Sequence, residues 1–130
     1  MFRYININMN SITAIVVAAG RGTRAGSGIP KQYREIAQKP ILHYTIDALL
    51  AHKAIDNIIC VIHNDDKQLY KNAVSRINNP RLSKPVLGGA TRSESVFNGI
   101  KAASSEYVLI HDGARPCLPI VALKRLINGL

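Results

Sequence analysis

A run of β-branched residues that stops abruptly at small residues constrains the fold of this chain most strongly. Thr13-Ala14-Ile15-Val16-Val17 leads directly into Ala18-Ala19-Gly20-Arg21-Gly22-Thr23-Arg24. An apolar run of this kind, bounded by glycine, is typical of a strand buried in a parallel sheet. Glycines at the carboxyl end of such a strand let backbone N–H groups approach an anion closely. Because Arg21, Arg24 and Lys31 stand beside them, the loop suits a nucleoside triphosphate.

The spacing of these glycines excludes the two commonest phosphate-binding motifs. The P-loop pattern G-x-x-x-x-G-K-[ST] is absent, because Lys31 neither follows a glycine nor precedes Ser or Thr. The dinucleotide pattern G-x-G-x-x-G is absent too, because Ala25 stands where the third glycine would be. An ordinary βα turn with solvated arginines is the alternative; the length of the loop favours ligand binding.

Strands and helices alternate along the rest of the chain. The patterns predict strands over 13–17, 57–62, 84–87 and 107–110, and helices over 41–51, 65–76, 92–103 and 119–128. Asn64 or Asp65 is the expected cap of the second helix. This order predicts an α/β fold with a doubly wound, mostly parallel sheet. We expect residues 1–12 to be a leader and residues 13–130 to form one domain.

The charge balance raises a second hypothesis, a basic module that binds nucleic acid. The chain has 17 Lys and Arg against 8 Asp and Glu, a formal net charge of +9. The basic residues are scattered, and aromatic residues, which stack on single-stranded bases, make up 5% of the chain. An anionic small-molecule substrate therefore fits at least as well, and we expect no nucleic-acid partner.

The remaining compositional signals indicate a protein of the cytoplasm. No apolar run has the length that a bilayer span needs. Residues 1–11 lack the continuous hydrophobic region of a signal peptide, and translation begins at either Met1 or Met9. Cys60 and Cys117 occur in unrelated contexts, so we expect reduced thiols.

Chemistry-bearing segments follow three of the predicted strands. The first is the Gly/Arg loop, the second is Gly88-Gly89-Ala90-Thr91-Arg92-Ser93-Glu94-Ser95, and the third is His111-Asp112-Gly113-Ala114-Arg115-Pro116. Ligands of open α/β sheets bind outside the carboxyl ends of the strands, where these segments converge. Asp112 is placed to hold Mg²⁺, and a helix cap or a partner for Arg115 is the alternative.

Other polar residues are expected to be structural. His63 precedes Asn64-Asp65-Asp66 in what reads as a solvated turn, and His111 is expected to be hydrogen-bonded within the fold. The nucleophile elbow G-x-S-x-G does not occur in the sequence, so covalent catalysis has no support.

Together these segments and Pro30-Lys31-Gln32-Tyr33 resemble 2-C-methyl-D-erythritol 4-phosphate cytidylyltransferases, enzymes of non-mevalonate isoprenoid biosynthesis. The resemblance runs from about Thr13 to the chain end. It implies a Rossmann-like nucleotidyltransferase that takes CTP and methylerythritol 4-phosphate, uses Mg²⁺, and releases pyrophosphate. Pentitol-phosphate cytidylyltransferases are the sibling alternative; Tyr33 and Ala114 favour the first family.

The resemblance also implies a role for each site residue. Arg24 and Lys31 would be catalytic, stabilising the transition state, and Asp112 would hold Mg²⁺. The remaining residues would bind the nucleotide: Ala18, Ala19, Gly20, Gly22, Gly88, Gly89, Ser95 and Arg115.

One departure from the family is a matter of length, because its catalytic domain is considerably longer than this chain. The resemblance thus implies the N-terminal portion of a homodimeric enzyme, and we expect the isolated segment to be inactive. The sequence of its glycine-bearing motifs is similar to that of the bifunctional enzymes, in which this domain is fused to a cyclodiphosphate synthase. Gly113 also stands where the family more often has Ala.

Overall fold

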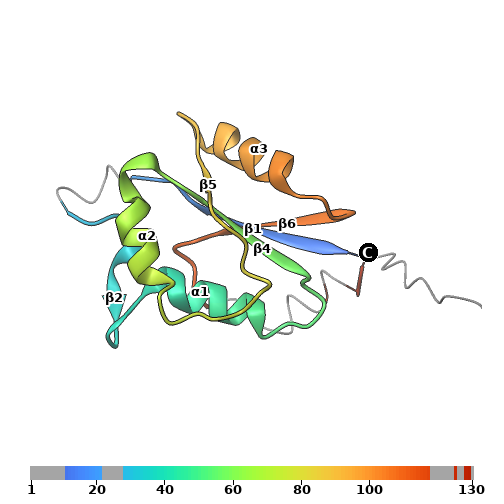
Figure 1. The fold of residues 1–130 in the computed structure, drawn as a ribbon, viewed down its shortest axis with the longest axis horizontal. Coiled ribbons are helices and arrows are strands. Elements are labelled where there is room, and N and C mark those ends of the chain that lie inside the picture. The colour runs from blue at the N-terminus through green and yellow to red at the C-terminus, as the bar shows by residue number, and fades with distance from the viewer. Residues whose placement is uncertain (1–10, 22–27, 118–124, 126–127, 130) are drawn as a thin grey trace, which may run out of the picture.

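The computed structural model describes residues 11–21, 28–117, 125 and 128–129, and its centre is a four-stranded sheet in the order β5-β4-β1-β6 (Figure 1). β1 (Ile12–Ala18) lies between β4 (Asn57–Ile62) and β6 (Tyr107–Asp112), and β5 (Val86–Leu87) pairs with β4. Every pairing in this sheet is parallel. The predicted doubly wound, parallel α/β sheet is confirmed.

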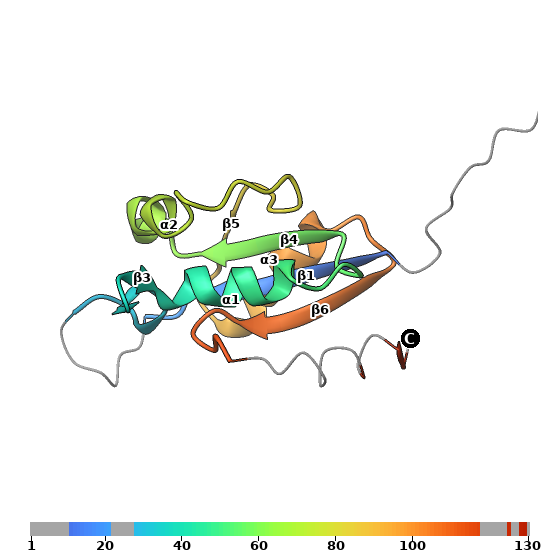
Figure 2. The ribbon, with the colours of Figure 1, turned by 90° about the horizontal axis from the view of Figure 1, so that it is seen from below.

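Side chains of the central strands alternate between two covering layers. Ala14, Val16 and Cys60 belong to the core cluster that includes residues of α1 (Ile41–Leu50) and α2 (Lys67–Ala73). α3 (Arg92–Ala102) covers the opposite face, as Figures 1 and 2 show. It comes close through Gly99, where an added Cβ would lie 2.6 Å from Ile15 Cγ2. None of the described helices is long and apolar enough to cross a bilayer.

Both cysteines are free thiols, but their surroundings differ. Cys60 is fully buried in β4, whereas Cys117 is exposed. Burial raises the pKa of the Cys60 thiol to about 12, so this group stays protonated and packs as an apolar side chain.

The start of the sheet differs from the prediction. β1 begins at Ile12, so the last residue of the predicted leader belongs to the sheet. Its backbone N–H donates to Asp56 Oδ2 at 2.8 Å, which ties the strand start to the segment before β4. β5 covers only Val86–Leu87 of the predicted strand 84–87.

The predicted helix 65–76 is shorter and begins differently. It consists of the 3₁₀ turn η3 (Asn64–Asp66) followed by α2. His63 caps it, because the His63 Nδ1 atom accepts a hydrogen bond from the Asp65 backbone N–H at 3.0 Å. The expected cap at Asn64 or Asp65 is therefore wrong by one or two positions. Most of the predicted helix 119–128 lies outside the described residues.

A short hairpin that sequence patterns did not predict precedes α1. β2 (Glu35–Ile36) and β3 (Lys39–Pro40) pair in antiparallel fashion. Ala37 and Gln38 form the turn with φ angles of 50° and 70°. Glycine, asparagine and aspartate are the usual residues in such a turn, so the sequence carries no turn signal here.

Gly88, directly after β5, lies where three elements meet, and its replacement should destabilise the fold. A Cβ at this position would lie 2.6 Å from both Ala19 Cβ and Ser95 Oγ. Ala19 Cβ moves only with its backbone, so Gly88→Ala must push the turn away from the loop after β1. We expect a loss of about 1–3 kcal/mol in the free energy of unfolding, typical of overpacking.

Gly20→Ala is the matched control, because nothing lies within 4 Å of a Cβ added there. Chemical denaturation of both variants and of the parent protein measures the difference. Equal midpoints for Gly88→Ala and Gly20→Ala would contradict the close approach.

Candidate functional site

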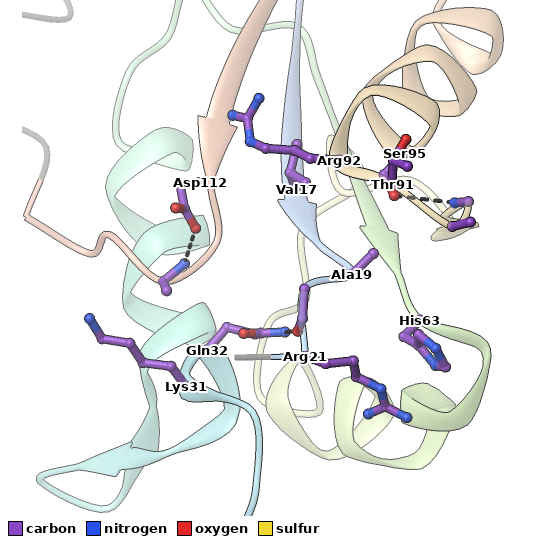
Figure 3. Close-up of a pocket in the computed structure, with 14 residues that line it drawn as sticks. Val17, Ala19, Arg21, Lys31, Gln32, His63, Thr91, Arg92, Ser95 and Asp112 are labelled. Atoms are coloured by element: carbon purple, nitrogen blue, oxygen red, sulfur yellow. Dashed lines mark hydrogen bonds between the residues drawn. The ribbon is translucent and has the colours of Figure 1, made fainter. Parts of the chain in front are cut away.

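A cavity of about 550 Å³ opens at the carboxyl ends of β1 and β6 (Figure 3). Val17 and Asp112, which are partners across the β1–β6 pairing, both line it. The chain leaves β1 toward β4 and β5 on one side and returns with β6 on the other. The cavity therefore lies at the topological switch point, where open α/β sheets bind ligands.

The 3₁₀ turn η2 (Lys31–Tyr33) forms the wall beside the Gly/Arg loop. Pro30 precedes it with φ −52°, and the Tyr33 N–H donates to the Pro30 carbonyl at 2.9 Å. Gln32 is buried, and its Nε2 donates to the carbonyls of Ala18 at 2.8 Å and Gly20 at 3.1 Å. One side chain thus anchors the backbone on which a phosphate would rest.

Arg21 is engaged by carboxylates rather than free for a ligand. Its Nη1 lies 2.7 Å from Asp66 Oδ1, and its Nη2 lies 3.0 Å from Asp65 Oδ2. In Figure 3, Arg21 and Lys31 extend away from each other, Arg21 on the side of His63 and Lys31 on the side of Asp112. The sequence groups Arg21 with Lys31 as cations for a triphosphate, whereas the structure separates them.

Internal hydrogen bonds hold the turn between β5 and α3. Thr91 caps α3, because its side chain accepts from the Glu94 N–H at 3.1 Å, and Glu94 Oε2 accepts from the Ala90 N–H at 2.7 Å. The buried Ser95 Oγ accepts from the Gly89 N–H at 3.2 Å. This turn and Arg92 form the wall opposite η2.

Asp112 ends β6 with one carboxylate oxygen engaged. Its Oδ1 accepts from the Ala114 N–H at 3.0 Å, and its Oδ2 lies 3.9 Å from the Nε of the exposed Arg115. His111 Nε2 lies 2.8 Å from the Arg115 carbonyl oxygen, which agrees with its expected structural role. Thr45 on α1 donates to the Gly113 carbonyl at 3.0 Å, so the segment after β6 is anchored to a helix.

The structure divides the predicted site residues into three groups. Those that line the cavity are Ala19, Gly20, Lys31, Gly89, Ser95 and Asp112. Ala18, Gly88 and Arg115 do not line it: the first two support the adjacent backbone, and Arg115 is 81% exposed. Gly22 and Arg24 lie outside the described residues.

Sequence reasoning missed several lining residues: Gln32, His63, Thr91 and Arg92. All of them stand next to a carboxyl strand end or inside a motif that was already recognised. The positions of His63, Thr91 and Arg92 could have identified them, since the residues after each parallel strand share one edge of the sheet. His63, interpreted as part of a solvated turn, directly follows β4 and reaches the cavity for this reason.

The charges of the described lining residues favour an anion. Lys31, Arg21 and Arg92 are cationic, and Asp112 is the single carboxylate among the described lining residues. Because Arg21 is already paired with Asp65 and Asp66, Lys31 and Arg92 are the lining cations that remain for a ligand. Backbone amides, two cations and one carboxylate suit a phosphate chain that brings a metal ion with it.

Comparison with known proteins identifies the family. The family model of 2-C-methyl-D-erythritol 4-phosphate cytidylyltransferase matches residues 12–130. A bifunctional IspD/IspF enzyme of Rhizorhabdus wittichii is 47% identical over 120 residues, covering 92% of this chain and 31% of that protein. A 2-C-methyl-D-erythritol 4-phosphate cytidylyltransferase of Clostridium botulinum is 44% identical over 110 residues, covering 83% of this chain and 48% of that protein.

A solved structure agrees with the sequence relatives. The crystal structure of the 4-diphosphocytidyl-2C-methyl-D-erythritol synthase of Anaerococcus prevotii superimposes with a TM-score of 0.77 at 34% identity. The match covers 95% of this chain and 52% of that one. The chain thus spans about half or less of the length of these relatives. On its sequence and its fold, this chain belongs to the 2-C-methyl-D-erythritol 4-phosphate cytidylyltransferase family.

Proposed function

We propose that the protein transfers CMP from CTP to 2-C-methyl-D-erythritol 4-phosphate and releases pyrophosphate. The observation that carries the proposal is the cavity at the switch point of the sheet, which Lys31, Arg92 and Asp112 line together with the glycine-bearing loop after β1. Membership of the family supplies the identity of the two substrates. The protein would act in the cytoplasm as a homodimer and would need no nucleic-acid partner.

The chemistry needs charge stabilisation and alignment rather than a protein nucleophile. An oxygen of the acceptor phosphate would form a bond to the α-phosphorus of CTP, while the bond from this phosphorus to the bridging oxygen breaks and pyrophosphate leaves. Lys31 is exposed on the cavity wall and would stabilise the charge that develops on the α-phosphate. Arg24 would act with it.

The nucleotide would lie across the described walls of the cavity. The backbone of Ala18, Ala19 and Gly20, fixed by Gln32, would receive the triphosphate, with Gly22 continuing that loop. Gly88, Gly89 and Ser95 would form the wall against which the cytidine binds. Their turn is held by a hydrogen bond and leaves room only for small side chains. Arg115 would support the segment after Asp112.

Mg²⁺ fits the donors at Asp112 if the nucleotide supplies most of the ligands. The Ala114 N–H orients one carboxylate oxygen, and the carboxylate side chain is 48% exposed. No group of three or more metal-ligating side chains occurs among the described residues. Mg²⁺ commonly binds through one or two carboxylates together with phosphates and waters, so Asp112 alone is sufficient on the protein side. The ion would supply positive charge to the phosphate oxygens.

The proposed reaction predicts pyrophosphate release that depends on all three components. The complete protein, incubated with CTP, Mg²⁺ and methylerythritol 4-phosphate, should release pyrophosphate in a coupled assay. Release with ribitol 5-phosphate instead would assign the protein to the pentitol-phosphate enzymes. A preference for another nucleoside triphosphate would contradict both assignments. Oligonucleotide binding that CTP–Mg²⁺ does not displace would support a separate nucleic-acid function.

Lys31→Ala should lower kcat far more than it raises the KM for CTP. The charge on the α-phosphate builds up only during transfer, so a cation placed there acts mainly on the transition state. Loss of one such group costs about 3 kcal/mol, or roughly a hundredfold in kcat. Steady-state kinetics with CTP as the varied substrate measures both constants.

Lys53→Ala is the matched control, because Lys53 is exposed near the amino end of β4, away from the cavity. Its constants should match those of the parent protein. A Lys31→Ala variant with an unchanged kcat and a raised KM would refute the assigned role.

A further inference from the structure

A buried carboxylate of η3 lies behind the wall of the cavity that the Gly/Arg loop and η2 form. Asp66 in η3 is 2% exposed, and its Oδ1 lies 2.7 Å from Arg21 Nη1. Arg21 belongs to the Gly/Arg loop, and the adjacent Gly20 carbonyl accepts a hydrogen bond from Gln32 in η2. The loop is thus held twice: through its backbone by η2 and through a side chain by η3.

Burial makes this ion pair different from a surface pair. A carboxylate inside a protein loses its hydration, which is costly unless a cation and hydrogen bonds replace the water. Asp65 pairs with the same guanidinium and serves as a comparison. Its Oδ2 lies 3.0 Å from Arg21 Nη2, but its side chain is 68% exposed. The pair with Asp66 is the one that fixes the position of the guanidinium, because water screens the other.

Tyr33 of η2 lies close enough to the same carboxylate to feel its charge. Asp66 Oδ2 and the Tyr33 hydroxyl are both buried, and neither has a hydrogen-bond partner among the described residues. Burial, and then the charge of Asp66, raise the pKa of the Tyr33 hydroxyl, which therefore remains a protonated donor. The Asp66 carboxylate thus pairs with Arg21 and acts electrostatically on Tyr33, which belongs to the turn that carries Lys31.

We propose that Asp66 is a positioning residue for the nucleotide loop, acting through Arg21. The pair holds Gly20 and Arg21 in the conformation that receives a triphosphate, and it keeps the Arg21 guanidinium away from the phosphates. Arg21 is then a structural anchor rather than a phosphate ligand. This role rests on the proposed use of CTP at this cavity, and it implies that Arg21 is a lining cation that does not contact the nucleotide.

A double-mutant cycle on the complete protein tests this assignment. Affinity for CTP–Mg²⁺ is measured by titration calorimetry, and kcat and KM are measured for Asp66→Asn, Arg21→Met and the double variant. We expect each single variant to weaken CTP binding by about tenfold, a typical coupling within one network. The double variant should bind CTP no more weakly than either single variant, because both changes break the same ion pair. Asp65→Asn, the exposed control, should stay within about twofold of the parent protein.

Other outcomes would overturn the proposal. If Arg21→Met weakens binding while Asp66→Asn leaves it unchanged or strengthens it, Arg21 is a phosphate ligand. If the losses in the two single variants add in the double variant, the residues act separately. If thermal stability falls while the affinity, kcat and KM stay unchanged, the pair serves folding only.

The design separates this inference from the proposed function. A parent protein that binds CTP but does not transfer CMP to methylerythritol 4-phosphate would contradict the proposed reaction alone, and the CTP affinities would still decide the role of Asp66. A parent protein that binds no CTP would overturn both.

Discussion

The structure depends on the burial of β1 between two parallel neighbours. Ala14, Ile15 and Val16 have no exposed surface, and the strand pairs with β4 over residues 13–18 and with β6 over residues 12–17. Parallel pairing brings the carboxyl ends of these strands to one edge. The cavity forms there because the chain runs from β1 to β4 and β5 on one side and later returns to β6 on the other side of β1.

Rigid support around that edge comes from buried polar side chains rather than from the loops themselves. Gln32 fixes the backbone after β1, Thr45 fixes the segment after β6, and Ser95 fixes the turn before α3. Each of these side chains is buried, and each bonds to a backbone group that would otherwise lose its partner. Binding elements held in this way need little reordering when a ligand arrives, which lowers the entropic cost of binding.

Electrostatic roles in the cavity are divided by burial and pairing. Arg21, Lys31 and Arg92 all line it, yet Arg21 is neutralised by Asp65 and Asp66. A guanidinium suits such a place because its planar fork can bind two carboxylates at once, whereas an ammonium is a point charge. Lys31 and Arg92, on opposite walls, are then the lining cations that remain for a ligand. This arrangement suits a linear chain of phosphates.

Sequence patterns alone determined the fold class, the segments at the cavity and the family resemblance. Long apolar runs such as 57–62 and the glycine turns at 20 and 88 are local signals, and local signals survive in a sequence. Tertiary structure decided the rest. The Ala37-Gln38 turn, the pairing of Arg21 with Asp66, and the reach of His63 into the cavity join residues through space, or defy local propensity. No spacing rule encodes such contacts, because they depend on how separate segments pack around one buried strand.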